Sequence, residues 1–443
     1  MNIGSDIFSS PVRQEEDAGE SLTQRLYTRH PGLPEASAKD STQKALDELR
    51  KLAAAEPWQE KNTSAPTRTP TEESSDLEQE IHSFQRYQQD LVKNYLELSH
   101  NRPKLLDYGL YILHGWEEQN TPVQMLPFSL LTEESRKSTG GHYVRLKGKG
   151  IVINPGSGFM ENFHQQNLSI KDIDFVIVTR NHIEAHNDVK KIYELNNESN
   201  KNSSHIHIIH YYLQQAAYQE LAASLKPNFR NARHTIHSLE TYLDSPDVEN
   251  VELSDGIRLH YFQTTQERDF PIVIRLEITD SGAHNQQGKP GIRLGYISGT
   301  GWSPLIAHHL GRCDVLLAGF GNTNQNDYTL LSYNEDTLGF YGTYSLFEEV
   351  APRLMLCTEF GGREGDIRAE VIKKIREDVE GGARSLPYEP IALPGDIGLT
   401  VDLLTFKIQC SMSHTFVDPS QVRIVKTSES FGRLQYLAPR FCI

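Results

Sequence analysis

The sequence predicts an α/β fold in which sheets are layered between helices. From about Leu105 onward, short apolar runs that are typical of buried strands alternate with stretches of helical periodicity, and this alternation continues through both halves. Hydrophobic residues make up 37% of the 443-residue chain, which is enough for a sizeable core. By length alone, such a chain forms up to about three domains or one elaborated domain.

The charge balance and the cysteines argue against several classes of protein. The 44 Lys and Arg residues against 59 Asp and Glu residues give a net charge of −15, which opposes broad binding to nucleic acid or to anionic membranes. No run approaches the ~18 apolar residues of a membrane helix, and the first residues lack the pattern of a signal peptide. Four scattered cysteines without a C-x-x-C pair suit a reducing compartment. We therefore expect a cytoplasmic protein.

The first part of the chain, residues 1–76, is predicted to be a flexible extension and linker. Gly, Ser, Pro and acidic residues without periodicity fill its beginning, which is a composition typical of disorder. A short helix is expected after Asp40, where Ser41 can act as the N-cap. The prolines, serines and threonines of Glu56–Asp76 then favour a linker.

A longer helix is predicted within residues 77–104. Its apolar side chains recur at heptad spacing along one face, and Gln88 interrupts them. Such a face either packs on the protein's own domain or binds a protein partner through this N-terminal helix, and the pattern leaves both alternatives open. Pro103 predicts the end of the helix, because the residue before a proline avoids the helical region. The apolar face consists of Leu77, Ile81, Phe84, Leu91, Tyr95 and Leu98.

Residues 105–443 are predicted to form the α/β domain. An amphipathic segment at Asp366–Val379 predicts a helix, and a second helix is expected at Tyr211–Leu225. Apolar and β-branched runs predict the strands. These strands are expected at 142–147, 151–154, 174–179, 204–210, 259–262, 272–278, 293–297, 314–318 and 354–358.

The sharpest candidate site follows the strand predicted at Asp174–Thr179. A polar cluster comes directly after this strand and opens a predicted helix. Catalytic groups and metal ligands often project from such a turn, because the edge of a sheet is rigid and open. The cluster contains Arg180, His182, Glu184, His186 and Asp188.

This cluster resembles the Thr-His-x-His-x-Asp-His signature of the metallo-β-lactamase-fold hydrolases. Further segments resemble that family in the same order, and together they cover roughly residues 105–415. The resemblance implies a metallo-β-lactamase-like αββα sandwich, and several segments fit one bacterial subgroup. The further segments are Gly140–Gly156, Leu294–Gly301, Asp336–Gly342, Glu359–Gly361 and Pro394–Leu399.

In that family, histidines and aspartates hold two zinc ions, and a bridging hydroxide attacks an ester, an amide or a phosphodiester. The resemblance places Arg180 at the position of the first histidine and retains the second histidine as His182. Glu184 stands at the position of the aspartate, and Ala185 at that of the histidine beside it. The first half of the ligand set is therefore degenerate.

Three further positions of the family site are replaced as well, and one family histidine has no assigned position in this sequence. Gly299 stands at the position of the aspartate that bridges the metals, Thr337 at that of the last histidine, and Asn154 at that of the first-hairpin aspartate. Ala185 and Gly299 offer no donor atom, and the cation of Arg180 opposes a dication. Because zinc needs about three protein ligands even in an open site, we expect no metal and no other cofactor here.

Two questions stay open at the level of the sequence. His182 and His186 lie at i and i+4, so on a helix they would share a face and could rebuild a mononuclear zinc site with Glu184 or Asp188. Arg180 could form a salt bridge with Glu184 that fills the space of the metals. It could instead bind a small anionic ligand such as a phosphate.

The resemblance implies a pseudoenzyme, which keeps the scaffold of a metal-dependent hydrolase for binding, sensing or assembly and has no catalytic residues. The bacterial subgroup includes components of multi-gene antiphage systems, which suggests a role in antiviral defence. The alternative is a metal-dependent hydrolase with a rebuilt or mononuclear zinc site, phosphodiesterase-like by analogy with the family.

Overall fold

The chain divides into two units, residues 1–81 and 82–443, and the boundary falls within helix α3 (Pro70–Leu98). The short helix predicted after Asp40 lies outside the residues that the computed structural model describes. The described ranges are 70–98, 105–118, 140–201, 205–225, 234–241, 248–264, 270–278, 291–323, 332–362, 366–380, 388–410, 415–426 and 434–437.

Helix α3 begins at Pro70, within the segment predicted as a linker. The earlier start has a simple cause, since proline is favoured in the first turn of a helix, where its missing N–H needs no partner. Farther along, Phe84 and Leu91 are 60% and 50% exposed, so the domain does not cover them. Near the end of the helix, the Tyr95 hydroxyl accepts a hydrogen bond of 2.9 Å from the backbone N–H of Ile170. Among the described helices, none has the length and apolar character that crossing a membrane requires.

The first sheet has eight strands in the described part of the chain, in the order β16-β15-β1-β3-β4-β5-β6-β7. The strands from β4 to β7 are parallel, whereas the pairs on the other side of β4 are antiparallel. The strands are β1 (Gly109–Ile112), β3 (His142–Leu146), β4 (Lys149–Ile153), β5 (Phe175–Val178), β6 (Ile209–Gln214), β7 (His234–Leu239), β15 (Thr400–Asp402) and β16 (Ile408–Gln409).

The second sheet has the order β14-β13-β12-β11-β10-β9-β8, and a short strand, β2, pairs with β13. The strands from β11 to β14 are parallel, and those from β8 to β11 are antiparallel. The strands are β2 (Glu117–Glu118), β8 (Glu249–Ser254), β9 (Ile257–Gln263), β10 (Ile272–Ile278), β11 (Arg293–Ile297), β12 (Val315–Asn322), β13 (Leu354–Gly362) and β14 (Ile391–Pro394).

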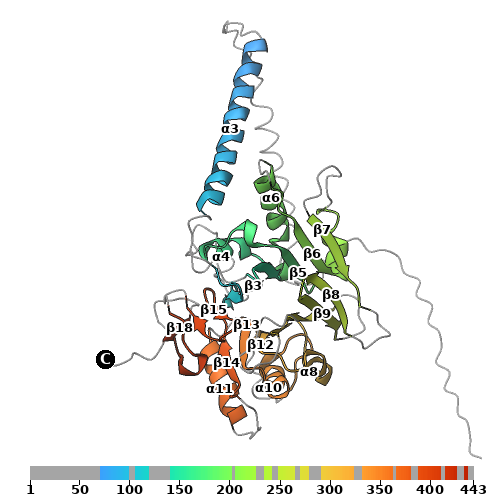
Figure 1. Cartoon of the computed structure of the whole chain (residues 1–443), viewed down its shortest axis with the longest axis vertical. Helices are drawn as coiled ribbons and strands as arrows, with labels where there is room; N and C mark the ends of the chain where they lie inside the picture. Colours follow the sequence, from blue (N-terminus) through green and yellow to red (C-terminus); the bar gives the residue numbers. More distant parts are fainter. Residues whose placement is uncertain are drawn as a thin grey trace, which may run out of the picture. The chain divides into compact units, whose positions relative to one another are not determined.

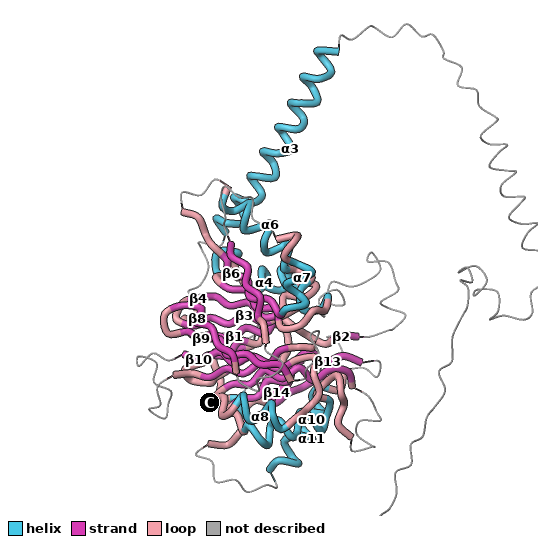
Figure 2. The backbone as a smooth tube through the Cα atoms, turned by 90° about the vertical axis from the view of Figure 1, so that its right-hand side faces the viewer, coloured by secondary structure: helices cyan, strands magenta, loops and turns pink. Residues whose placement is uncertain are grey.

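Helices cover the outer faces of both sheets, as the views in Figures 1 and 2 show. One group packs on the first sheet and a second group on the second sheet, so the predicted αββα sandwich is confirmed. The first group is α4 (Phe159–Gln165), α6 (Val189–Asn200) and α7 (Gln215–Leu221), and the second is α8 (Pro304–Leu310), α10 (Gly339–Val350) and α11 (Arg368–Glu380).

Shorter elements complete the described fold. They are the helix α5 (Ile183–His186), the 3₁₀ turns η5 (Ile170–Asp172) and η6 (Pro419–Gln421), and a hairpin of β17 (Arg423–Lys426) with β18 (Leu434–Leu437).

The alternation of side chains along the central strands explains the layering. In β12, Val315 and Leu317 point into the core between the sheets, whereas Leu316 and Ala318 point toward the helices. All four side chains are buried, as a parallel strand covered on both faces requires. Burying a large apolar side chain contributes about 1.5–3 kcal/mol, so these layers hold the strand ends rigidly in place.

One predicted strand is wrong. The alternating pattern at 204–210 indicated a strand, but Ile206 and Ile208 are exposed and β6 begins at Ile209. The strand begins five residues later than predicted, because Tyr211 and Leu213 bury against the helices that cover the first sheet. The predicted helix at 211–225 is consequently shortened to α7, whose N-cap is Gln214.

Candidate functional site

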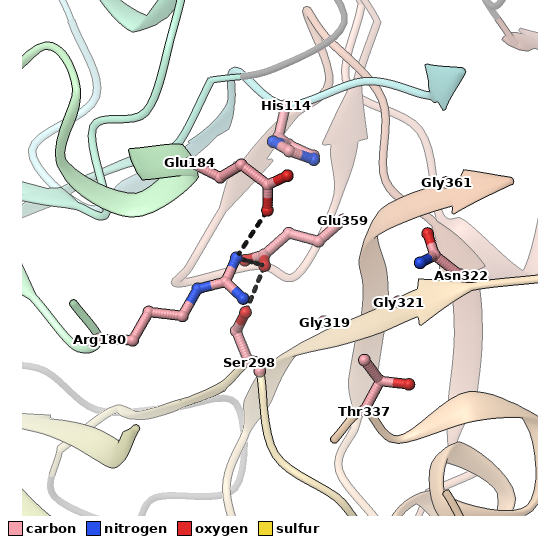
Figure 3. Close-up of a pocket in the computed structure, with 11 residues that line it drawn as sticks. His114, Arg180, Glu184, Ser298, Gly319, Gly321, Asn322, Thr337, Glu359 and Gly361 are labelled. Atoms are coloured by element: carbon pink, nitrogen blue, oxygen red, sulfur yellow. Dashed lines mark hydrogen bonds and ion pairs between the residues drawn. The ribbon is translucent and has the colours of Figure 1, made fainter. Parts of the chain in front are cut away.

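The candidate site lies where parallel strands of both sheets end (Figure 3). β5 of the first sheet leads into Arg180, while β11, β12 and β13 of the second sheet supply most of the remaining groups. Ligand sites of α/β proteins occur at such carboxyl ends. A cavity of about 90 Å³ lies here, lined by His114, Arg180, Glu184, Ser298, Gly299, Gly319, Gly321, Asn322, Thr337, Glu359 and Gly361.

The guanidinium of Arg180 joins the two sheets across this cavity. Its Nη2 atom lies 3.3 Å from Oε2 of Glu359 and 3.5 Å from Oε2 of Glu184. Glu184 lies on α5, next to the first sheet, whereas Glu359 belongs to β13 of the second sheet. The side chains are 19% exposed for Arg180 and 12% for Glu359, so water screens this ion pair only in part. The Arg180–Glu184 pair suggested by the sequence is present, but the more deeply buried partner is Glu359.

Gly299 makes room for this arginine. Its φ of +67° lies in the left-handed region that favours glycine. A Cβ atom at this position would lie 2.7 Å from Nη1 and 2.9 Å from Cδ of Arg180. The aspartate that the family resemblance expects at this position would therefore collide with Arg180, so the two replacements fit each other.

Glu359 is the centre of the hydrogen-bond network. Its φ of +54° is unusual for a residue other than glycine and is often found at functional sites. The hydroxyl of Tyr296 donates to Oε1 at 2.5 Å, and the hydroxyl of Ser298 donates to Oε2. Burial of the Glu359 carboxylate opposes its charged form. His142, whose Nε2 lies 3.7 Å from Oε1 of Glu359, and the cation of Arg180 outweigh this effect and hold the pKa of Glu359 well below its usual range.

Asn154 links this network to the first sheet. Its amide nitrogen donates to the Tyr296 hydroxyl at 2.7 Å and to Oγ1 of Thr179 at 2.8 Å, while its Oδ1 accepts from the Thr179 backbone N–H. The left-handed φ of +48° suits an asparagine. An ionised aspartate here would have no proton to donate to Tyr296, which itself donates to Glu359. The amide of Asn154 therefore fits this hydrogen-bond network better than the carboxylate of an aspartate would.

Among the residues that line the cavity, two have a buried atom that can accept a hydrogen bond and has no partner among the described residues. These atoms are Nε2 of His114, which follows β1, and Oγ1 of Thr337, which precedes α10. Burial lowers the pKa of His114 to about 4, although the charge of Glu359 acts in the opposite direction. His114 is therefore neutral at pH 7.

We expect His114 to make the protein sensitive to acid. The unfolded chain binds a proton at His114 below the ordinary histidine pKa of 6.5, whereas the folded protein resists protonation down to about pH 4. Stability should therefore fall by about 3 kcal/mol as the pH drops through this window. Urea unfolding at several pH values should show a shallower fall for His114→Gln. Equal slopes for both proteins would contradict this assignment.

The structure separates the three other polar residues of the predicted cluster. His182 has extended backbone angles and precedes α5, so it does not form with His186 the helical i, i+4 pair that the alternative of a rebuilt site required. His182 is half exposed and its Nδ1 accepts from the Glu184 N–H at 3.4 Å, whereas His186 is buried. Asp188 is buried too, where it accepts from the Met160 N–H at 3.0 Å. None of the three lines the cavity.

The residues at the family's ligand positions do not fit a dinuclear metal centre. Ala185 is buried and carries no donor atom, and Gly299 has no side chain. Arg180 places a cation next to the position of the expected metals. Within the described ranges, no three His, Cys, Asp or Glu side chains converge in a way that could hold a metal ion.

Sequence reasoning missed the roles of Glu359, Tyr296 and His114. A usable signal existed for Glu359, because it is the one charged residue in a strand that is otherwise uncharged and buried. The hydroxyl of Tyr296 gave no such signal, since tyrosine is common in strands. His114 follows a short strand that the sequence pattern did not predict.

Comparison with known proteins finds solved structures that are similar to the structure of this chain. No family model matches the sequence, and no curated protein matches it. Among solved structures, the metallo-β-lactamase fold protein YhfI from Bacillus subtilis has 10% identity and a TM-score of 0.47, covering 66% of this chain and 98% of its own. The fold is similar to that of metallo-β-lactamase proteins.

Two further solved structures are similar to this chain. Human tRNase Z, short form, has 8% identity and a TM-score of 0.44, covering 67% of this chain and 99% of its own. Zn²⁺-bound PqqB from Methylobacterium extorquens has 11% identity and a TM-score of 0.45, covering 67% of this chain and 100% of its own. At such identities the similarity concerns the fold alone, and the chemistry depends on the residues of this chain.

Proposed function

We propose that this chain is a catalytically inactive metallo-β-lactamase-like protein that acts as a binding, sensing or assembly component. The observation that carries the proposal is the guanidinium of Arg180, which is paired with Glu184 and Glu359 where the resemblance expects the metals. With Gly299 in place of the bridging aspartate, the site favours the arginine over a metal ion. The ion pairs then take over the linking of the two sheets.

Metal analysis tests this proposal. Protein purified without chelator should contain well under one zinc, manganese or iron ion per chain. EDTA should leave its melting temperature unchanged, because no binding free energy is removed. Stoichiometric metal that supports thermal stability would instead favour the alternative, a phosphodiesterase-like hydrolase with a rebuilt site.

The charges around Arg180 bear on the choice between a structural and an anion-binding role. Glu184 and Glu359 already pair with the single guanidinium. A phosphate would have to lie beside these two carboxylates, which repel it, so the structural role is the better supported of the two. A place in bacterial antiphage defence remains a proposal from the sequence resemblance.

We also propose that α3 binds a helix of a protein partner. Leu77, Ile81, Phe84 and Leu91 recur at the 3.5-residue spacing of a coiled coil, and about half or more of each side chain is exposed. An exposed apolar stripe of this length is usually covered by another surface. The stripe therefore supports a role in assembly.

Charge insertion into the stripe tests this role. Phe84→Glu combined with Leu91→Glu should abolish a specific complex in co-purification and leave the melting temperature of the α/β domain unchanged. Gln79→Glu with Gln89→Glu adds the same charge at other exposed positions of α3 and should keep the complex. If the stripe variant keeps its partners and its melting temperature, α3 is merely solvated and the assembly role loses its support.

A further inference from the structure

A groove of about 620 Å³ lies between helix α11 and strand β17 of the β17–β18 hairpin (Figure 1). Its volume falls within the range of ~300–1,000 Å³ that is typical of ligand sites. The floor of the groove is apolar and consists of Ala369 and Ile372 from α11, Val422 just before β17, and Ile424 within it. No residue of this lining belongs to the cavity beside Arg180, so the groove is a separate site.

The groove follows the open edge of β17. In the described part of the chain β17 pairs only with β18, so its other edge has no strand partner. Three successive residues, Val422, Arg423 and Ile424, line the groove, although successive side chains of a strand point to opposite faces. A groove that contacts both faces of a strand runs along its edge. Such an edge presents N–H and C=O groups with which another extended segment can pair.

Two arginines at the rim of the groove have no ion-pair partner among the described residues. Arg376 of α11 is half-buried, and Arg423 of β17 is exposed. The third basic residue of the lining, Lys373, pairs with Glu377 at 3.7 Å. Glu370, the other carboxylate of the lining, already has an interaction of its own. The groove therefore offers two cations with which the carboxylates of a ligand can pair.

We propose that this groove binds an acidic peptide in extended form, which adds to the open edge of β17 as a third strand. Main-chain hydrogen bonds to β17 supply affinity in this mode of recognition, and alternate side chains supply specificity. Side chains on one face of the peptide lie beside Ile424 and bury apolar surface. Those on the other face carry carboxylates toward Arg423 and, across the groove, toward Arg376. The inference goes beyond the proposed function, because it uses neither the Arg180 cavity nor α3.

Other occupants match the groove less well. A small anion such as phosphate could pair with the arginines, but it would cover neither the apolar floor nor the edge of β17. Nucleic acid would be repelled by the net charge of −15, and the lining has no aromatic side chain on which a base could stack. A basic peptide would meet the two unpaired arginines as like charges.

Fluorescence anisotropy with the full chain tests the inference. The probe is a short labelled peptide of alternating glutamate and valine, capped at both ends, which as a strand has carboxylates on one face and apolar side chains on the other. It should bind saturably with a Kd below about 1 mM. A peptide of alternating lysine and valine should not bind. A glutamate–valine peptide that is N-methylated at each backbone nitrogen should not bind either, because it lacks the donors that strand pairing needs.

Substitutions at the rim identify the binding site. Arg376→Gln and Arg423→Gln should each weaken binding about fivefold or more, because each removes a charge-assisted hydrogen bond. Arg258→Gln, at an exposed arginine of β9, is the matched control and should leave binding unchanged. Both rim variants should melt like the wild type, since neither arginine has an ion pair to lose.

The inference is overturned if the glutamate–valine peptide does not bind, or if the lysine–valine or the N-methylated peptide binds as tightly. It is also overturned if either rim variant binds like the wild type. Metal analysis and the α3 variants test the proposed function without this peptide. Failure of the peptide therefore leaves the proposed function intact, and stoichiometric metal would leave this inference intact.

Discussion

Replacing Arg180 by alanine should lower the free energy of unfolding by about 3–5 kcal/mol, which is the cost of leaving a buried charge without its partner. The carboxylate of Glu359 is 12% exposed and would lose the guanidinium at 3.3 Å. Glu184 is 30% exposed and can turn to water, so Glu184→Ala should cost less, about 1 kcal/mol. The unequal costs follow from burial, since solvent screens the outer carboxylate more strongly.

A double-mutant cycle separates the ion pair from general damage to the site. Glu359→Gln keeps the shape of the side chain and removes the charge, so the double variant with Arg180→Ala should cost less than the sum of the two single changes. Lys190→Ala is the control, because it breaks an exposed ion pair with Glu194 and should change stability by under about 0.5 kcal/mol. Urea unfolding measures all four variants. Additive effects would show that Arg180 and Glu359 do not stabilise each other.

Local sequence patterns predicted the parts of the fold that depend on local chemistry. The strands β10 and β11 match the predicted ranges, because most of the apolar residues in them are buried. The replaced ligands at Arg180 and Gly299 were also visible, since each falls within a short motif of recognisable order. The residues at these positions can be identified from the neighbouring sequence alone, without information about contacts between distant residues.

The centre of the site depends on contacts that local patterns do not encode. Glu359 lies 179 positions from Arg180 in the sequence, and the two sheets bring them together. The left-handed φ of Glu359 likewise depends on its place in β13. The sequence did not indicate this angle, because the residue is neither a glycine nor an asparagine. The residues at the family's ligand positions could therefore be identified from the sequence, whereas the groups that pair with Arg180 required the packed sheets.

Gly299→Ala should destabilise the protein by about 3 kcal/mol, because two separate costs add. The φ of +67° strains any residue with a Cβ atom, at about 1 kcal/mol, and contact with Arg180 at 2.7 Å and 2.9 Å adds about 1–3 kcal/mol of overpacking. Gly148→Ala is the matched control. It has a φ of +77°, and its added Cβ would meet an atom of Arg145 only at 3.8 Å, so the backbone strain alone remains.

The contact with Arg180 can be isolated by removing the arginine. In the Arg180→Ala background the space beside Gly299 is open, so the added cost of Gly299→Ala should shrink to about 1 kcal/mol, as at Gly148. A smaller cost of Gly299→Ala in the Arg180→Ala background would mean that Arg180 requires a residue without a Cβ atom at position 299. Urea unfolding of the single and double variants measures this cost. If Gly299→Ala costs no more than Gly148→Ala in the wild-type background, Arg180 does not occupy the space of the bridging aspartate, and the claim that it replaces the metals fails.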